Sequence, residues 1–330
     1  MGVRVEGEVV KLDRGFPLVR TADGRQFRSE HATNLVKSTK GTASVGTEAG
    51  ESGRAVIGDR VQLLLPNDHD KAIIERILPR TRELVRKDPT ERAVPQVLAA
   101  NFDRVIIAQA LGEVNMRRLE RELVLACETG AAVTVVLTKA DLAESEQEVA
   151  SIRSQVQALA GPDTETLVIS ADAPASVEAV RELLAEGTTT VLVGRSGVGK
   201  SSLINLLCGE DVQETGDVRA VDGKGRHTTV SREMVSVPGG GRVVDMPGVR
   251  GLGLWEADAG IEAAFSDIAV IAEGCRFRDC KHEKEPGCAV RAAVEAGEVD
   301  PARFESYRGL KAETSKMKER REQARWRRKR

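Results

Sequence analysis

A glycine-rich segment at residues 194–201 constrains the fold of this chain more than any other part of its sequence. It reads Gly-Arg-Ser-Gly-Val-Gly-Lys-Ser and lies between an apolar run at residues 191–193 and a helix-type segment at residues 203–208. This is the Walker A pattern in the strand-to-helix context that it requires. Glycines let backbone N–H groups wrap phosphate oxygens, and the N-terminus of the following helix favours negative charge. The segment predicts a nucleotide-phosphate site on an α/β sheet.

Two side chains of this segment carry expected chemistry. Lys200 should reach the β- and γ-phosphates, and the Ser201 hydroxyl should ligate Mg²⁺. The remaining contacts are expected from backbone N–H groups. The predicted nucleotide-binding residues here are Gly194, Arg195, Ser196, Gly197, Val198, Gly199, Lys200, Ser201 and Ser202.

Residues 80–254 alternate short apolar runs with helix-length segments, which is typical of a parallel sheet covered on both faces. Polar signatures begin where these runs end, at positions 138, 170, 194 and 245. Ligands of open α/β sheets bind at the carboxyl ends of the strands, so these signatures are expected to share one crevice. The apolar runs are residues 105–108, 133–137, 167–169, 191–193 and 243–244.

The signature at residues 138–141, Thr-Lys-Ala-Asp, resembles the guanine-recognition motif of GTPases, usually Asn-Lys-x-Asp. The Asp141 carboxylate can accept from the adjacent N1–H and N2–H donors of guanine, a pair that adenine lacks. The Lys139 stem would cover the base or the ribose. Thr138 stands in place of the usual Asn and cannot make the same amide contacts, so weaker nucleotide affinity is expected. The predicted guanine contacts are Thr138, Lys139, Asp141 and the strand-end pair Ser170 and Ala171.

Two later segments predict contacts around the γ-phosphate. Residues 245–248, Asp-Met-Pro-Gly, resemble the GTPase Asp-x-x-Gly motif. Asp245 would hold Mg²⁺ through water, and the Gly248 N–H would contact the γ-phosphate. Residues 225–229, Gly-Arg-His-Thr-Thr, resemble switch I, in which a threonine completes the Mg²⁺ shell only while the γ-phosphate is present. The two candidates for that ligand are Thr228 and Thr229.

The position after the Asp-x-x-Gly motif lacks a polar group. Ras-like proteins carry there a Gln that orients the attacking water, whereas this chain has Val249. Slow intrinsic hydrolysis is therefore expected, with help from another residue or from a partner. His227 is the catalytic candidate within the chain. The alternative, a loop histidine with no chemical role, stands equal to it.

The motifs run in an unusual order, because the guanine motif at 138 precedes the phosphate loop at 194. Conventional GTPases place the phosphate loop first. The same crevice can form if the sheet is circularly permuted, since chain ends lie at the surface and are often close together. The segment after residue 248 then enters a cysteine-rich region directly, so that the nucleotide state can move that region.

Four candidate metal ligands lie within fourteen residues of sequence. Three cysteines and one histidine suit a closed tetrahedral Zn²⁺ site with no open position for catalysis. A structural zinc there would contribute on the order of 10 kcal/mol to folding of this segment. The ligands are Cys275, Cys280, His282 and Cys288.

The ends of the chain differ from its middle. Residues 1–79 read as five or so short strands, interrupted by a Gly/Ser/Thr-rich loop at residues 38–53. This pattern predicts an OB-type barrel, although SH3-like barrels have similar patterns. Residues 255–330 form a third region, and its last part, residues 311–330, holds ten Lys or Arg against three Glu. Such a tail usually meets RNA, DNA or an acidic surface. No leader and no apolar run of membrane-spanning length is evident, so a cytoplasmic protein with no membrane partner is expected.

With these motifs in view, the chain resembles the ribosome small-subunit-dependent, circularly permuted GTPase family over essentially its whole length. The match is carried by the phosphate loop, by Gly-Arg-His-Thr-Thr at 225–229 and by Asp-Met-Pro-Gly-Val at 245–249. The resemblance implies an α/β fold with a permuted P-loop GTPase domain between an OB-type barrel and a zinc-binding helical region. It also implies GTP and GDP as ligands, 16S rRNA and the 30S subunit as partners, a monomer, and a role late in subunit maturation.

Two other functions fit part of the sequence. A plain RNA-binding module could keep the nucleotide site only to stabilise its fold. Aromatic residues make up only 3% of the chain, however, so few side chains are available to stack on bases. A phosphotransferase or ATPase would also carry a Walker A loop. The strand-end position of Asp141 argues against it.

Overall fold

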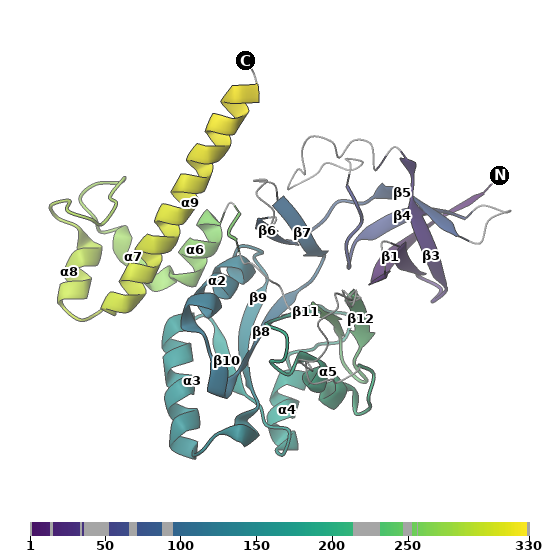
Figure 1. Cartoon of the computed structure of the whole chain (residues 1–330), viewed down its shortest axis with the longest axis horizontal. Coiled ribbons are helices and arrows are strands. Elements are labelled where there is room, and N and C mark those ends of the chain that lie inside the picture. Colours follow the sequence, from purple (N-terminus) through teal and green to yellow (C-terminus); the bar gives the residue numbers. More distant parts are fainter. Residues whose placement is uncertain are drawn as a thin grey trace, which may run out of the picture.

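A computed structural model of the chain describes residues 2–13, 16–33, 35, 53–65, 71–87, 95–213, 232–246, 253–255 and 257–328. Residues 38–52 of the predicted Gly/Ser/Thr-rich loop, and the segments 225–229 and 247–249, lie outside this described part. Three regions follow one another along the chain: a barrel, an α/β sheet and a group of helices (Figure 1). Among the described residues, no helix combines the length and the apolarity that a membrane crossing needs.

The N-terminal region is a five-stranded barrel, as expected from the sequence. Strand β1 pairs with both β2 and β4, and β5 pairs with both β3 and β4, so the ladder closes on itself. Alternate residues of these strands, such as Val19, Leu63 and Ile74, point inward and are fully buried. The strands are β1 (Val3–Asp13), β2 (Phe16–Thr21), β3 (Gln26–His31), β4 (Arg60–Leu65) and β5 (Ala72–Ile77).

The central region is a mixed sheet in the order β10-β9-β8-β11-β13-β12, in which β12 alone is antiparallel to its neighbour. Successive residues of β8 face opposite sides: Ile107 packs with helices α2 and α3, and Ile106 packs with α4 and α5. The strands are β8 (Arg104–Ala110), β9 (Ala132–Thr138), β10 (Glu165–Val168), β11 (Thr189–Val193), β12 (Arg232–Ser236) and β13 (Arg242–Asp245). The helices are α2 (Met116–Cys127), α3 (Glu146–Ala160), α4 (Pro174–Arg181) and α5 (Lys200–Cys208).

Strand β12, which the apolar runs did not predict, joins the barrel to the central sheet. It pairs with β1 in antiparallel register, with Lys11 opposite Glu233, so one sheet of eleven strands runs through both regions. The Lys11 ammonium lies 2.7 Å from the Glu233 carboxylate, and Arg242 at the start of β13 bonds Glu8 of β1. The barrel is therefore fastened to the strand pair that leads into Asp245.

A second junction lies where the chain leaves the barrel. Arg80 donates to Asp59, which is fully buried, at 2.6 and 2.8 Å, and also to Glu83 at 3.0 Å. A short hairpin of β6 (Glu83–Lys87) and β7 (Pro95–Ala100) follows. Gly58 has φ +82°, and a Cβ there would lie 2.0 Å from the Ala100 carbonyl oxygen, so this contact between barrel and hairpin requires glycine.

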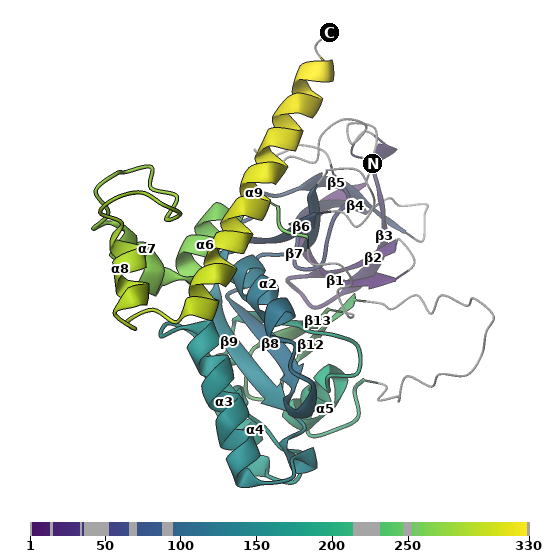
Figure 2. The same cartoon turned by 60° about the vertical axis from the view of Figure 1, so that its left-hand side comes forward.

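The C-terminal region is helical and packs on α2 and α3. Arg303, at the start of the last helix, donates to the Leu159 carbonyl oxygen at the end of α3 and to both oxygens of Asp267. The helices are α6 (Asp258–Ala264), α7 (Ser266–Ala272), α8 (Ala289–Glu295) and α9 (Pro301–Arg328). Helix α9 is buried as far as Thr314 and then extends beyond the body of the molecule (Figure 2).

Candidate nucleotide and metal sites

The phosphate loop lies where the sequence predicted it, between the end of β11 and the start of α5. Gly194 has φ +151°, and a Cβ there would lie 2.5 Å from the carbonyl oxygen of Ala108, so the loop can only take this course with glycine. Gly197 and Gly199 also have positive φ. The Lys200 ammonium donates to the carbonyl oxygens of Gly194 and Arg195, at 3.1 and 2.9 Å. The lysine thus occupies the concave side of the loop, where phosphates would lie.

Lys200 and Asp245 form the charged centre of this site. Burial lowers the pKa of the Lys200 ammonium, while the carboxylates of Asp245 and Glu122 oppose that shift. Burial likewise raises the pKa of Asp245, and Lys200 opposes it. The Oδ1 atom of Asp245 is buried without a hydrogen-bond partner among the described residues. A buried, unpartnered carboxylate oxygen beside a phosphate loop fits a divalent cation such as Mg²⁺.

The two predicted guanine-binding segments meet at the ends of neighbouring strands. Asp141 Oδ1 accepts from the backbone N–H of Ala171 at 3.2 Å, and the Ala140 N–H donates to the Ile169 carbonyl oxygen at 3.2 Å. Lys139 has φ +59°, an uncommon conformation for a residue other than glycine, and it turns the chain at the strand end. The structure thus brings Asp141 together with Ser170 and Ala171, as the sequence predicted.

Thr138 lies between the guanine-motif segment and the phosphate loop. Its side chain is 3% exposed, its hydroxyl hydrogen-bonds the carbonyl oxygen of Val198 in the phosphate loop, and it lies 3.2 Å from the carbonyl oxygen of Gln109. Thr138 therefore links the guanine-binding segment to the phosphate loop across the end of β8.

The other predicted nucleotide contacts divide into two groups. Arg195, Ser196, Gly197 and Ser202 are exposed, and Ser201 is half-buried in the first turn of α5. The residues expected around the γ-phosphate in the two switch segments, His227, Thr228, Thr229 and Gly248, lie outside the described residues. Of the residues in these two motifs that are expected to contact the γ-phosphate or its Mg²⁺, the structure therefore describes Asp245 alone.

Sequence reasoning missed a buried polar pair beside this site. Glu122 of α2 and Gln109 near the end of β8 are 3% and 1% exposed and hydrogen-bond each other. The one signal in the sequence is a glutamate within the apolar stripe of α2.

The four predicted metal ligands converge in the C-terminal region. The three Sγ atoms and the His282 ring nitrogen all lie within 4.8 Å of one another. Cys275 Sγ lies 3.6 Å from His282 Nδ1 and 3.9 Å from Cys288 Sγ. His282 Nδ1 and Cys288 Sγ are 3.3 Å apart. His282 has φ +57°, an uncommon backbone conformation for a residue other than glycine. This donor set can hold one metal ion.

Comparison with known proteins agrees with this geometry. A sequence model of the RsgA GTPase family matches residues 77–255. The small ribosomal subunit biogenesis GTPase RsgA of Streptomyces coelicolor is 40% identical over 317 residues, which cover 94% of this chain and 81% of that protein. The protein of the same name from Syntrophotalea carbinolica is 38% identical over 312 residues, covering 94% of this chain and 83% of that protein.

Solved structures share the fold. The crystal structure of YjeQ from Thermotoga maritima has a TM-score of 0.66 and 25% identity, over 94% of this chain and 99% of that one. The structure of YloQ, described as a circularly permuted GTPase, has a TM-score of 0.63 and 23% identity, with 96% of each chain covered. The motif order, the crevice and the extent of the sequence matches lead to one conclusion: the chain belongs to the RsgA GTPase family.

Proposed function

We propose that this GTPase binds the small (30S) ribosomal subunit and assists its late maturation. The subunit stimulates GTP hydrolysis, and hydrolysis controls release of the protein. The observation that carries the proposal is the extent of the match. Two relatives named as small ribosomal subunit biogenesis GTPases align over 94% of the chain, so the similarity includes the barrel and the C-terminal helices as well as the GTPase region.

The nucleotide binds in the crevice at the carboxyl ends of β8, β9 and β11. Lys200 leaves its two backbone carbonyl partners to neutralise the β- and γ-phosphates, and Ser201 and Asp245 hold Mg²⁺ there. The Asp141 carboxylate accepts from guanine, with Lys139, Ser170 and Ala171 around the base. Thr228 or Thr229 and Gly248 complete the γ-phosphate contacts, with His227 as a candidate to orient water.

The Cys/His cluster holds one structural zinc ion per chain. A tetrahedral zinc with Zn–S bonds of about 2.3 Å and Zn–N bonds of about 2.0 Å separates its ligand atoms by roughly 3.5–3.8 Å. Those separations match the 3.3–3.9 Å found between Cys275, His282 and Cys288. Three thiolates and an imidazole leave no open position, so the ion stabilises the region and takes no part in hydrolysis.

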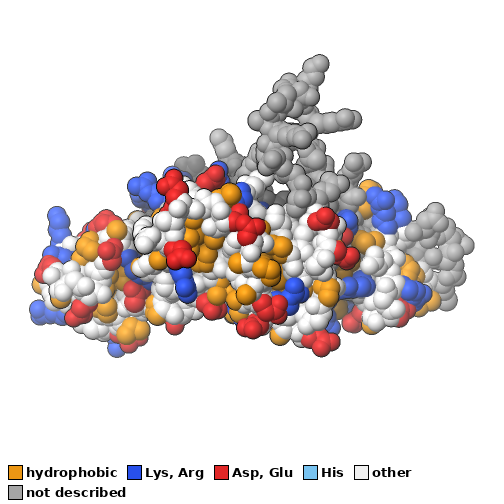
Figure 3. All heavy atoms as spheres, turned by 90° about the horizontal axis from the view of Figure 1, so that it is seen from below, with side chains coloured by type: hydrophobic (Ala, Val, Ile, Leu, Met, Phe, Trp, Pro, Cys, Tyr) orange, Lys and Arg blue, Asp and Glu red, His pale blue; other side chains and the backbone are white. Residues whose placement is uncertain are grey.

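The contact with 16S rRNA lies in part on the exposed end of α9. Acidic and basic side chains are interspersed over the face shown in Figure 3, whereas residues 311–330 carry ten basic and three acidic residues. A concentrated positive charge of this kind favours phosphate contacts.

The protein acts as a cytoplasmic monomer, with its barrel in residues 1–79, its GTPase domain in 80–254 and its zinc-binding region in 255–330.

GTP turnover with and without isolated 30S subunits tests this proposal. Wild-type protein is expected to hydrolyse GTP slowly alone and faster with subunits, while Lys200→Ala should abolish both activities because charge on the transferring phosphoryl group is no longer neutralised. Turnover of Lys200→Ala within about twofold of the wild type would remove Lys200 from the active site. Wild-type turnover that does not respond to subunits would contradict the ribosomal role.

A further inference from the structure

Helix α2 buries a carboxylate where its pattern favours an apolar side chain. Glu122 is 3% exposed and lies among Leu119, Leu123 and Ala126, which are 0–2% exposed and form the apolar stripe of the helix. Burying a charge in such a place is costly unless partners compensate it. Packing alone therefore does not explain why α2 carries a glutamate at this position.

Both oxygens of this carboxylate have partners. Oε1 accepts from Arg118 Nε at 2.9 Å, one helical turn earlier, and Oε2 accepts from the Gln109 amide. Burial raises the pKa of Glu122, while the Arg118 and Lys200 cations oppose that shift. The ion pair with Arg118 holds the side chain in one position and favours its charged form.

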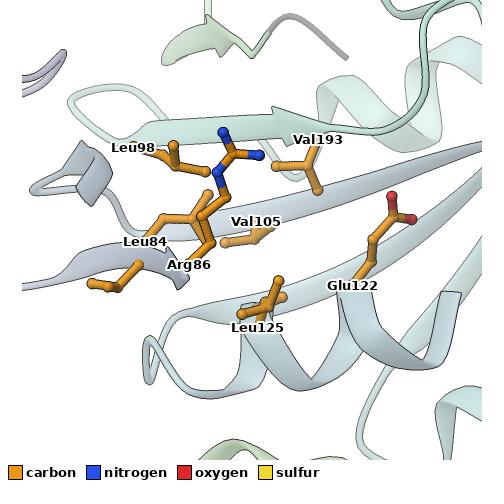
Figure 4. Close-up of a pocket in the computed structure, with 9 residues that line it drawn as sticks. Leu84, Arg86, Leu98, Val105, Glu122, Leu125 and Val193 are labelled. Carbon is orange, nitrogen blue, oxygen red and sulfur yellow. The ribbon is translucent and has the colours of Figure 1, made fainter. Parts of the chain in front are cut away.

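Glu122 faces the phosphate site. Gln109, which holds it, lies near the end of β8, and its carbonyl oxygen is 3.2 Å from the Thr138 hydroxyl. Glu122 also lines an apolar pocket together with Val193, the residue that precedes the phosphate loop (Figure 4). The charges of Asp245 and Glu122 raise the pKa of the Lys200 ammonium, and the Arg118 cation lowers it.

We infer that Glu122 is a specificity-determining residue of the nucleotide site: a fixed negative charge that weakens the binding of GTP relative to GDP. GTP brings one more phosphate group than GDP to the Lys200 end of the loop. Repulsion from Glu122 therefore acts more strongly on GTP, and Arg118 limits it by neutralising part of the charge. The inference rests on the proposed assignment of the phosphate loop, Lys200 and Asp245 to the nucleotide.

Two substitutions with opposite expected effects on nucleotide preference test this inference. The affinities for GDP and for the slowly hydrolysed analogue GTPγS are measured on the full-length protein with Mg²⁺ present. Glu122→Gln keeps the size of the side chain and removes its charge, so the preference for GTPγS over GDP should rise at least about threefold. Arg118→Met removes the compensating cation, so the same preference should fall. Glu146→Gln, an exposed carboxylate on neighbouring α3, is the matched control and should change neither affinity.

The outcomes separate the inference from the site assignment. A rise with Glu122→Gln and a fall with Arg118→Met support the role of Glu122. An unchanged or lowered preference in Glu122→Gln, while Lys200→Ala impairs both nucleotides, overturns that role and leaves the site intact. Wild-type affinities in Lys200→Ala overturn both. If Glu122→Gln does not fold, Arg118→Met decides alone, and an unchanged or raised preference in that variant overturns the inference.

Discussion

The hydroxyl of Thr138 connects two segments that are 60 residues apart in the chain. Its partner is the carbonyl oxygen of Val198, in the middle of the phosphate loop, and its methyl-bearing side chain lies in contact distance of the position where Gly199 would carry a Cβ. The residue is buried and its hydroxyl is the only polar group of its side chain. We therefore expect it to contribute to nucleotide binding by holding the phosphate loop in shape.

This position predicts different results for two conservative substitutions. Thr138→Val keeps the shape and leaves the Val198 carbonyl oxygen without its donor, so GDP affinity should fall about tenfold, as expected for the loss of one buried hydrogen bond. Thr138→Ser retains the hydroxyl and should stay within about twofold of the wild type. Fluorescent GDP titrations measure both. Equal losses in the two variants would show that packing of the methyl group, and not the hydrogen bond, matters.

At this scale the sequence predicts residues whose role is encoded locally. Lys200 and Asp141 could be assigned because the phosphate loop and the guanine motif are contiguous patterns with a fixed relation to a strand end. The contacts of Thr138 and Glu122 could not be assigned, because each joins elements that are distant in the sequence. A buried glutamate in an apolar stripe is visible in the sequence, but its partner Gln109 on β8 is identified only once the fold is known.

Among the elements of the α/β sheet, the strands with continuous apolar runs were predicted and β12 was not. Strands β8, β9 and β11 lie in the middle of the sheet, buried on both faces, and read as β-branched runs. Strand β12 reads Arg-Glu-Met-Val-Ser, with polar residues at both ends, because it lies at the edge of the α/β sheet. Its pairing with β1 depends on register and on the Lys11–Glu233 ion pair, which no local pattern encodes.

Arg303 holds three helices together, and its ion pair with Asp267 predicts a pH-dependent stability. Burial alone would raise the pKa of Asp267, but the hydrogen bonds and the charge of Arg303, together with backbone N–H groups, outweigh it, so the pKa lies below the ordinary value of 3.8. A lowered carboxyl pKa stabilises the fold above the unfolded-state pKa, and this stabilisation is lost as the pH falls through the folded-state value. The charged pair should thus be fully effective at neutral pH.

Asp267→Asn should accordingly lower the free energy of unfolding by about 2 kcal/mol at pH 7, less than for a fully buried pair because the Asp267 side chain keeps 34% of its surface exposed. The difference from the wild type should begin to shrink below about pH 4, where the unfolded-state carboxyl takes up protons, and should be lost below the folded-state pKa, where both proteins carry a neutral side chain. Denaturant unfolding followed by fluorescence of the buried Trp255, in a Trp326→Phe background, measures it. Glu298→Gln, an exposed carboxylate in the same region, is the control. A difference independent of pH would contradict the ion-pair origin.

In the whole molecule, elements that carry the nucleotide site are joined directly to both flanking regions. The strand that ends in Asp245 is paired with β12, which is paired with the barrel. Helix α2, which carries Glu122 on its inner side, bonds α9 on its outer side through Arg121 and Glu313. The motif order predicted that a permuted domain would feed directly into the metal-binding region. The two junctions themselves are formed by pairings between distant segments, which the sequence does not encode locally.

Among the side chains that the structure describes, Thr314 is the last buried one of helix α9. Beyond it the helix projects from the body of the molecule (Figure 1), with a further ion pair, between Lys318 and Asp258 of α6 at 2.7 Å. The basic tail thus has a docked part and a projecting part. Residues 315–330 carry nine basic and two acidic residues. Deleting them should weaken affinity for the 30S subunit and flatten its dependence on salt, because fewer counterions are released on binding. Intrinsic GTP turnover should change little, since the docked contacts of α9 with α2 and α7 are kept and the lost Lys318–Asp258 ion pair with α6 lies at the surface.

Glu319→Gln with Glu322→Gln gives the opposite change on the same helix: the net charge of residues 315–330 rises by two, so the salt dependence should steepen. Binding curves for wild-type, truncated and doubly substituted protein across a salt series measure all three. The alternative is that the projecting turns are only a solvated charged helix, like many other surface helices. In that case the three curves superimpose, and the affinity for RNA must come from the barrel and the Cys/His region, whose charged groups all three proteins share.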